Sequence, residues 1–130
     1  MATERRGVII VDDDSGFLNS LVRLLAAHGF DSRTFSSAEA LLDSDAAVTA
    51  NPILVDIQLG GISGIELRRR LLASGSNCPV IFMTAIDDDA ARKEAIHAGC
   101  VAYLKKPFAP HLLLDALGKA MTRGSTGRMT

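Results

Sequence analysis

Cysteine is scarce in this sequence, long apolar runs are missing, and neither sign of charge is in marked excess. The two cysteines, Cys78 and Cys100, are too few for a disulfide framework and lack the CxxC spacing of a metal site. We interpret them as small buried apolar residues of a protein in the reducing cytosol. The apolar runs span only a few residues, whereas a membrane helix needs about 20. The polar start MATERRG precedes no apolar signal segment, so a cytoplasmic protein without a membrane partner is expected.

The charge balance argues against a further class of function. The 14 Lys and Arg residues nearly balance the 15 Asp and Glu residues, and the net charge is -1. A domain that binds nucleic acid through broad electrostatic attraction carries a clear basic excess, so we expect no direct nucleic-acid binding. With 130 residues, of which 48% are hydrophobic and 22% charged, the chain has the length and composition of one globular domain.

Strand and helix patterns alternate along the chain. Short β-branched apolar runs predict strands at 7–11, 31–35, 53–56, 79–85 and 101–104. Apolar residues recur at helical spacing after these strands. Such β–α units predict an α/β fold, namely a doubly wound five-stranded parallel sheet with helices on both faces. We assign residues 1–123 to this domain and the polar, non-periodic residues 124–130 to a flexible tail or the start of a linker.

Local signals predict where several helices begin. Asp14 precedes the first helix as its cap, and Pro110 opens the last. Ser36 with Glu39 forms a capping box, in which Ser36 is the cap and Glu39 the third helical residue. The same Ser-x-x-Glu pattern at 63–66 predicts the start of the third helix.

Polar residues gather where the predicted strands end. Asp12 and Asp13 follow the first strand, Asp56 ends the third, Thr84 the fourth, and the fifth leads to Lys106. Ligands of a doubly wound sheet bind beyond these carboxyl ends, so the side chains should converge there. Neighbouring carboxylates repel one another unless a cation lies between them. Oxygen ligands without His or Cys favour Mg²⁺, with Mn²⁺ as an alternative.

Asp56 has a distinctive place among these residues, because it ends a central strand and a Gly-rich turn follows it. A carboxylate in this position can act as a nucleophile and form an aspartyl phosphate. The three oxygens of the transferred group then need neutralisation. Mg²⁺, the Lys106 ammonium and the Thr84 hydroxyl, with nearby backbone N–H groups, would supply it.

Four motifs carry a resemblance to a known family. VDDD, VDIQLGGISGIEL, FMTA and YLKKPF, in this order and spacing, resemble the receiver domain of two-component response regulators over residues 6–122. The resemblance implies a flavodoxin-like sheet with strand order 2-1-3-4-5. It also implies a signalling switch, which catalyses only its own phosphorylation and dephosphorylation.

The family's functional residues carry over by position. Asp56 matches the phosphoacceptor, which takes its phosphoryl group from a phosphohistidine of a sensor histidine kinase. The Mg²⁺ ligands implied are Asp12, Asp13, Asp56 and the backbone carbonyl of Gln58. Thr84 matches the switch hydroxyl, Tyr103 the switch aromatic residue and Lys106 the phosphate contact. The bond between Lys106 and Pro107 should be cis.

The resemblance also implies how the signal leaves the domain. Phosphorylation would remodel the surface of the fourth helix, fifth strand and fifth helix, which would bind an effector domain or partner protein, or form a homodimer. Two other functions remain open. One is a Mg²⁺-dependent phosphatase with an aspartyl nucleophile, although Gln58 stands where such enzymes place their general acid. The other is a degenerate receiver that binds a partner constitutively.

Overall fold

A computed structural model of the chain describes residues 6–46 and 51–129. In this part of the chain, parallel strands form a five-stranded sheet in the order β2-β1-β3-β4-β5. The strands are β1 (Arg6–Val11), β2 (Phe30–Phe35), β3 (Ile53–Asp56), β4 (Val80–Thr84) and β5 (Ala102–Lys105). The predicted fold class and strand order are confirmed. Each strand begins and ends within one residue of its predicted range.

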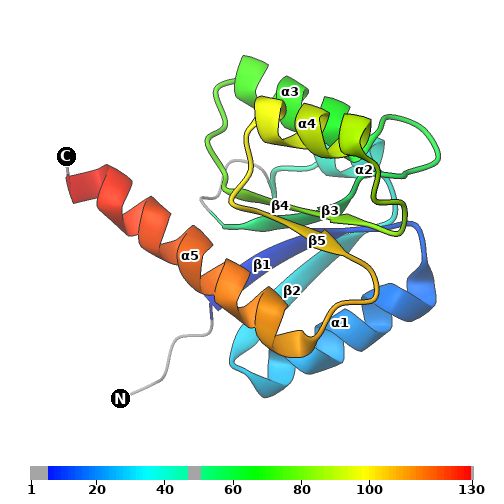
Figure 1. Cartoon of the computed structure of the whole chain (residues 1–130). Helices are drawn as coiled ribbons and strands as arrows, with labels where there is room; N and C mark the ends of the chain where they lie inside the picture. Colours follow the sequence, from blue (N-terminus) through cyan, green and yellow to red (C-terminus); the bar gives the residue numbers. More distant parts are fainter. Residues whose placement is uncertain (1–5, 47–50, 130) are drawn as a thin grey trace.

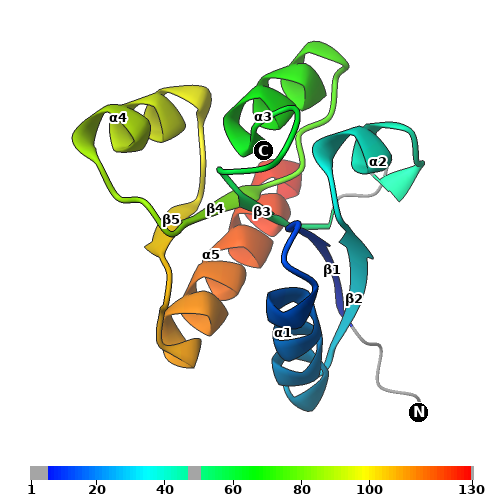
Figure 2. The ribbon, with the colours of Figure 1, turned by 90° about the vertical axis from the view of Figure 1, so that its right-hand side faces the viewer.

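Helices cover both faces of the sheet. They are α1 (Ser15–Ala27), α2 (Ala38–Leu42), α3 (Gly64–Ala73), α4 (Asp89–Ala98) and α5 (Pro110–Met129). Figures 1 and 2 show α2, α3 and α4 on one face and α1 and α5 on the other. Among the described residues, no helix is long and apolar enough to cross a membrane.

The sheet register aligns apolar side chains into rows that build two cores. Val11, Val55, Phe82 and Tyr103 are paired from β1 to β5 and pack toward α2, α3 and α4. The neighbouring row packs toward α1 and α5; it consists of Ile10, Leu54 and Ile81. Because β1, β3 and β4 are buried on both faces, only their ends are free to carry polar groups. The functional residues lie at these carboxyl ends.

One predicted helix cap is wrong. Asp14 caps α1 as predicted, and Ser63 caps α3. At α2, however, the cap is Ser37 and not Ser36, because the Ser37 hydroxyl accepts the N–H of Ala40 at 3.0 Å. A capping box needs its glutamate to turn back to the cap. Glu39 instead extends to another loop, where its carboxylate accepts the N–H of Ile62 at 3.1 Å.

The last helix is longer than the sequence pattern predicted. Residues 124–130 were expected to be irregular, but α5 continues to Met129, and only Thr130 of that segment lies outside the described residues. Helix propagation adds one backbone hydrogen bond per residue once a helix is nucleated, so a segment with weak helix propensity can extend an existing helix. In Figure 1 the carboxyl-terminal end of α5 extends past the edge of the sheet.

Candidate functional site

Three of the predicted site residues form one charged cluster. The Nζ atom of Lys106 donates to Asp12 Oδ2 at 2.6 Å and to Asp56 Oδ2 at 2.7 Å. Asp12 is fully buried, Asp56 is 6% exposed, and the Lys106 side chain is 15% exposed. The two carboxylates come from the ends of the adjacent strands β1 and β3, and Lys106 follows β5 directly. The convergence predicted at this edge of the sheet is thus present for these three residues.

Burial and ion pairing act against each other in this cluster. Burial raises the pKa of Asp56 above 3.8, and the hydrogen bonds from Lys106 and from the N–H of Gln58 offset only part of this effect. Burial alone would lower the pKa of Lys106. Hydrogen bonds to Asp12 and Asp56 outweigh it, so the pKa of Lys106 is raised above 10.5. The ammonium is therefore the stable form of Lys106 in this site.

The donor chemistry of the cluster fits a divalent cation. One ammonium already lies within hydrogen-bond distance of both Asp12 and Asp56, which shows that the two carboxylates can share a single positive charge. Two carboxylates facing one ammonium leave a negative charge in excess, and hard oxygen donors are the ligands Mg²⁺ prefers. Asp13 stays apart, since it is exposed and has no bond to this cluster among the described contacts. In the described residues, no group of three or more His, Cys, Asp or Glu side chains is placed to hold a metal ion, whereas Mg²⁺ is usually bound by one or two carboxylates and keeps several waters.

The loop after β3 holds the Asp56 side chain in place. Asp56 Oδ1 accepts the N–H of Gln58 at 2.8 Å, while Oδ2 faces Lys106. The start of α3 packs directly on this strand end, because the N–H of Gly64 reaches Ile57 O at 3.1 Å. A Cβ atom at Gly64 would overlap the backbone carbonyl of Asp56. Glycine at this position therefore permits α3 to approach the end of the strand, a role that the sequence pattern had not revealed.

Thr84 lies close to the cluster but bonds elsewhere. Its buried hydroxyl is 2.8 Å from Gln58 Oε1 and 2.7 Å from the backbone carbonyl of Ile86, and it accepts the N–H of Ile86 at 3.0 Å. A hydroxyl has one proton and can donate it to only one of the two oxygens. If the Gln58 amide is turned so that its NH₂ group faces Thr84, all of these contacts are satisfied. In either orientation, Gln58 and the loop after β4 hold the hydroxyl.

Tyr103, predicted as the switch aromatic residue, is half-buried and belongs to a second cluster. The guanidinium of Arg92, on α4, lies 4.9 Å from the centre of the Tyr103 ring and forms an ion pair with Asp87 at 3.0 Å. The Tyr103 hydroxyl is buried without a hydrogen-bond partner in the described part of the chain. Burial raises the pKa of Tyr103 above 10.0, and the nearby Asp87 carboxylate adds to this effect. Tyr103 is thus linked to the loop that follows Thr84.

The peptide bond between Lys106 and Pro107 is cis, as predicted.

A residue that the sequence pattern had not revealed also contacts the cluster: the ring of Phe17, in the first turn of α1, lies against the Lys106 ammonium. No residue spacing signals this contact, because Phe17 and Lys106 belong to opposite ends of the chain. In the sequence alone, Phe17 is one of several apolar residues at helical spacing.

Comparison with known proteins places these features in a family. Residues 8–118 match the family model described as the response regulator receiver domain. The transcriptional regulatory protein TdiR of Thauera aromatica is 34% identical over 114 residues, which cover 88% of this chain and 50% of TdiR. This chain therefore spans about half the length of curated relatives that it matches.

Solved structures agree with this match. The response regulator StyR superposes with a TM-score of 0.88 at 32% identity, over 96% of this chain and 63% of the StyR chain. A crystal structure of FixJ-N superposes with a TM-score of 0.83, also at 32% identity, over 91% of this chain and 94% of FixJ-N.

Proposed function

This chain belongs to the response regulator receiver domain family, a family of phosphorylation-dependent signalling domains, and on this premise we propose that Asp56 is its phosphoacceptor. The donor would be a phosphohistidine of a sensor histidine kinase. The proposal depends above all on the contact between Lys106 Nζ and Asp56 Oδ2 at 2.7 Å, which sets a fixed positive charge beside the proposed nucleophile. Relatives of this kind imply a histidine kinase partner and an effector domain.

The reaction transfers one phosphoryl group between two side chains. An oxygen of the Asp56 carboxylate forms a bond to phosphorus, and the bond between phosphorus and the kinase imidazole nitrogen breaks. The electron pair of that bond returns to the imidazole. Lys106 would neutralise one oxygen of the transferred group, and the Thr84 hydroxyl and backbone N–H groups of the adjoining loops another. Asp56 has to be ionised for this step, because the carboxylate and not the carboxylic acid is the nucleophile.

The proposed ligands of Mg²⁺ are Asp12, Asp13, Asp56 and the backbone carbonyl of Gln58, with Mn²⁺ as a possible substitute ion. When bound, such an ion neutralises negative charge on the phosphoryl oxygens. The support in this chain is the pair of carboxylates, Asp12 and Asp56, that already share one cation. Asp13 follows Asp12 in the sequence and is exposed, so its side chain would have to turn toward the ion to ligate it.

The output step would begin at Thr84. For Thr84 to contact a phosphoryl group on Asp56, its hydroxyl has to leave Gln58 and Ile86. Tyr103, whose hydroxyl is already buried, would then move further inward into the space that Thr84 leaves. The surface of α4, β5 and α5 would shift between two conformations as a result. We propose this surface as the contact for an effector or for a second copy of the chain. Residues 1–123 would form the cytoplasmic receiver, and the residues after it would lead toward an effector.

Incubation with acetyl phosphate and Mg²⁺, followed by intact-mass measurement, tests the proposal. The expected product carries the mass of one added phosphoryl group, and Asp56→Asn should abolish it. Asp45→Asn is the matched control, because the Asp45 side chain is 82% exposed and lies outside the cluster. An adduct that survives in Asp56→Asn, or no adduct in the wild-type protein, would refute the assignment of Asp56.

A further inference from the structure

The Lys106 ammonium has a third partner besides the two carboxylates. Its Nζ atom lies 4.1 Å from the centre of the Phe17 ring, within the range of a cation–π contact. Phe17 does not ligate, donate to or accept from any group of the predicted phosphorylation chemistry. Its contact with Lys106 is therefore a feature that the proposed function leaves unexplained.

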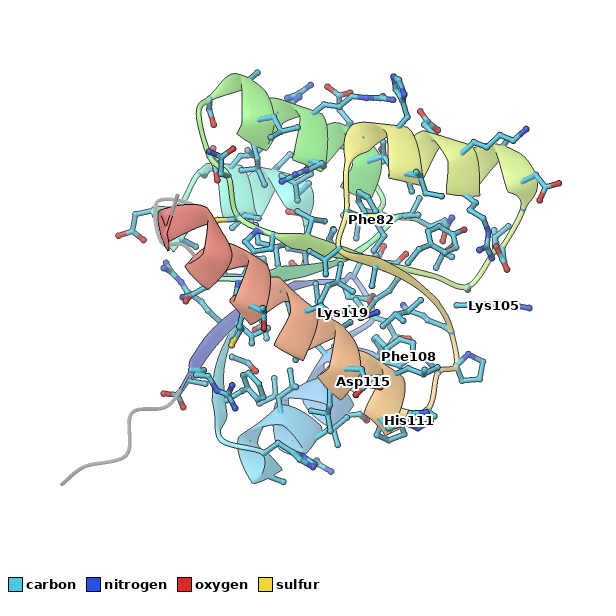
Figure 3. All side chains as sticks on the ribbon, turned by 60° about the vertical axis from the view of Figure 1, so that its left-hand side comes forward. Phe82, Lys105, Phe108, His111, Asp115 and Lys119 are labelled. Carbon is cyan, nitrogen blue, oxygen red and sulfur yellow. The ribbon has the colours of Figure 1, made fainter. Side chains whose placement is uncertain are left out.

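Two neighbours fix the position of the Phe17 ring. The N–H of Phe17 donates to the Asp14 carboxylate at 3.1 Å, so the cap of α1 holds the backbone of this residue. The ring also meets Phe108 edge to face, with centroids 6.1 Å apart and planes at 86°. Figure 3 shows Phe108 on the connection between β5 and α5, the same connection that carries Lys106. The aromatic pair thus ties the first turn of α1 to the connection that bears the lysine.

The chemistry of the three partners is complementary. The carboxylates of Asp12 and Asp56 attract the ammonium in two different directions. The lysine side chain is flexible, and several of its rotamers could place the ammonium at one carboxylate and away from the other. The ring restricts this freedom, since its face attracts the ammonium without offering a hydrogen bond that could replace a carboxylate. It also excludes water, and the Lys106 side chain is only 15% exposed. A cation–π contact is strongest when it is desolvated in this way.

We propose that Phe17 is a positioning residue that holds the Lys106 ammonium between Asp12 and Asp56. This inference rests on the proposed function, because the lysine needs to be positioned only if Asp56 receives a phosphoryl group. Without the aromatic face, the ammonium would spend less time at Asp56 and the rate of phosphorylation would fall. The Lys106 ammonium would also compete less strongly with a divalent cation for the carboxylates of Asp12 and Asp56. Loss of the ring should therefore lower the rate without weakening the affinity for Mg²⁺.

Phe17→Leu tests this role, because it keeps an apolar side chain but removes the aromatic face. Phe17→Tyr retains the face and should behave as the wild-type protein. Phe30→Leu is the matched control: Phe30 also has a cation–π contact, with Arg6 at 4.7 Å, but it lies at the opposite end of the sheet. Thermal unfolding of each variant shows how much stability is lost.

Three measurements follow in the same samples. In proton NMR, the ε-methylene protons of Lys106 should be shifted upfield by the ring in the wild-type protein and in Phe17→Tyr, and the shift should be lost in Phe17→Leu. The rate of phosphorylation by acetyl phosphate should fall about three- to tenfold in Phe17→Leu. The Mg²⁺ affinity, from chemical-shift titration, should be unchanged or up to a few-fold tighter.

The outcomes separate this role from simple packing. An unchanged rate in Phe17→Leu would overturn the proposal, as would a rate and a Mg²⁺ affinity that fall together, because that pattern indicates general loosening of the site. A fall in rate of the same size in Phe30→Leu would overturn it as well. If the wild-type protein forms no phosphoryl adduct, the proposed function fails, whereas the NMR shift and the Mg²⁺ affinity still report on Phe17 and Lys106.

Discussion

The hydroxyl of Thr84 lies 2.8 Å from the side-chain oxygen of Gln58, a residue two positions beyond the proposed phosphoacceptor. Both residues are connected to Asp56, Gln58 through its backbone N–H and Thr84 through the neighbouring strand. A switch that uses the Thr84 hydroxyl would have to break this contact first. The glutamine side chain is therefore expected to set part of the energy difference between the two conformations of the domain.

Gln58→Leu tests this expectation. One neutral hydrogen bond contributes about 0.5–1.5 kcal/mol, so its loss should ease the movement of Thr84 toward Asp56. We expect beryllium trifluoride, a stable mimic of a phosphoryl group on a carboxylate, to bind about two- to twelvefold more tightly in the presence of Mg²⁺. NMR titration measures the affinity directly, and the mimic avoids hydrolysis.

The control for this prediction is a double-mutant cycle with Thr84→Ala. Without the hydroxyl, the change at Gln58 has no bond to remove, so Gln58→Leu should leave the affinity of Thr84→Ala for the mimic unchanged. Equal gains in both backgrounds would show that Gln58 acts on the mimic itself and not through Thr84.

Asp56 should cost stability at neutral pH. Its folded-state pKa is raised above 3.8, with burial as the main cause, so the folded protein holds this proton more tightly than the unfolded chain does. The stability linked to this group is full below pH 3.8 and is lost as the pH rises through the raised pKa. Asp56→Asn cannot ionise, so at pH 7 it should unfold at a higher urea concentration than the wild-type protein.

The pH dependence distinguishes this effect from a general change in packing. The gain from Asp56→Asn should shrink as the pH is lowered through the raised pKa of Asp56, because the wild-type carboxyl then becomes neutral as well. Asp45→Asn, at an exposed site, should change the stability by less than about 0.5 kcal/mol at each pH. A gain from Asp56→Asn that is the same at all pH values would contradict the burial explanation.

The hydrogen bond from Ile62 to Glu39 should respond to acid. The pKa of Glu39 is lowered below 4.5, chiefly by the N–H of Ile62, so this contact persists above pH 4.5 and is lost as the pH falls through the lowered pKa. The amide signal of Ile62 in NMR should therefore shift with a midpoint below 4.5.

Two variants check the origin of that titration. Glu39→Gln should remove the step from the Ile62 signal. Gly61→Ala should weaken it, because the added Cβ would lie 2.5 Å from Glu39 Oε2 and push this flexible carboxylate away. An Ile62 signal that titrates unchanged in Glu39→Gln would assign the step to another group.

Tyr103 is the single tyrosine of the chain, so the absorbance of tyrosinate in the ultraviolet reports on this residue alone. Its pKa is raised above 10.0, by burial first and by the Asp87 carboxylate next, whereas the Arg92 guanidinium lowers it. Alkaline titration of Asp87→Asn should give a lower pKa than the wild-type protein, and Arg92→Ala a higher one. Shifts of the same sign in the two variants would show that packing and not charge governs Tyr103.

The fold was largely predictable because its signals are local. Buried parallel strands such as Ile53–Asp56 are continuous apolar runs, and caps such as Asp14 and Ser63 act within three residues. Two adjacent serines gave the one wrong cap. Ser37 and not Ser36 is the cap, and Glu39 bonds to Ile62, 23 residues away, in place of the cap. A local sequence pattern cannot predict this long-range contact.

The site was predictable in its residue types but not in its contacts. The carboxyl ends of parallel strands bring Asp12, Asp56 and Lys106 together in any sheet of this order. Three contacts depend on side-chain rotamers: the bridge from the lysine to both carboxylates, the contact between Thr84 and Gln58, and the aromatic ring that covers the ammonium. These follow from packing between segments that are far apart in the sequence.

The Lys106 bridge spans 94 positions of the sequence to Asp12 and 50 positions to Asp56. Chains are synthesised from the amino terminus, so a nascent chain has both carboxylates long before it has the lysine. Until β5 has joined the sheet, the acidic pair has no lysine beside it, and Asp56 lacks the cation that would neutralise an incoming phosphoryl group. On the proposed mechanism, a kinase could then signal only through copies of this domain that have finished folding.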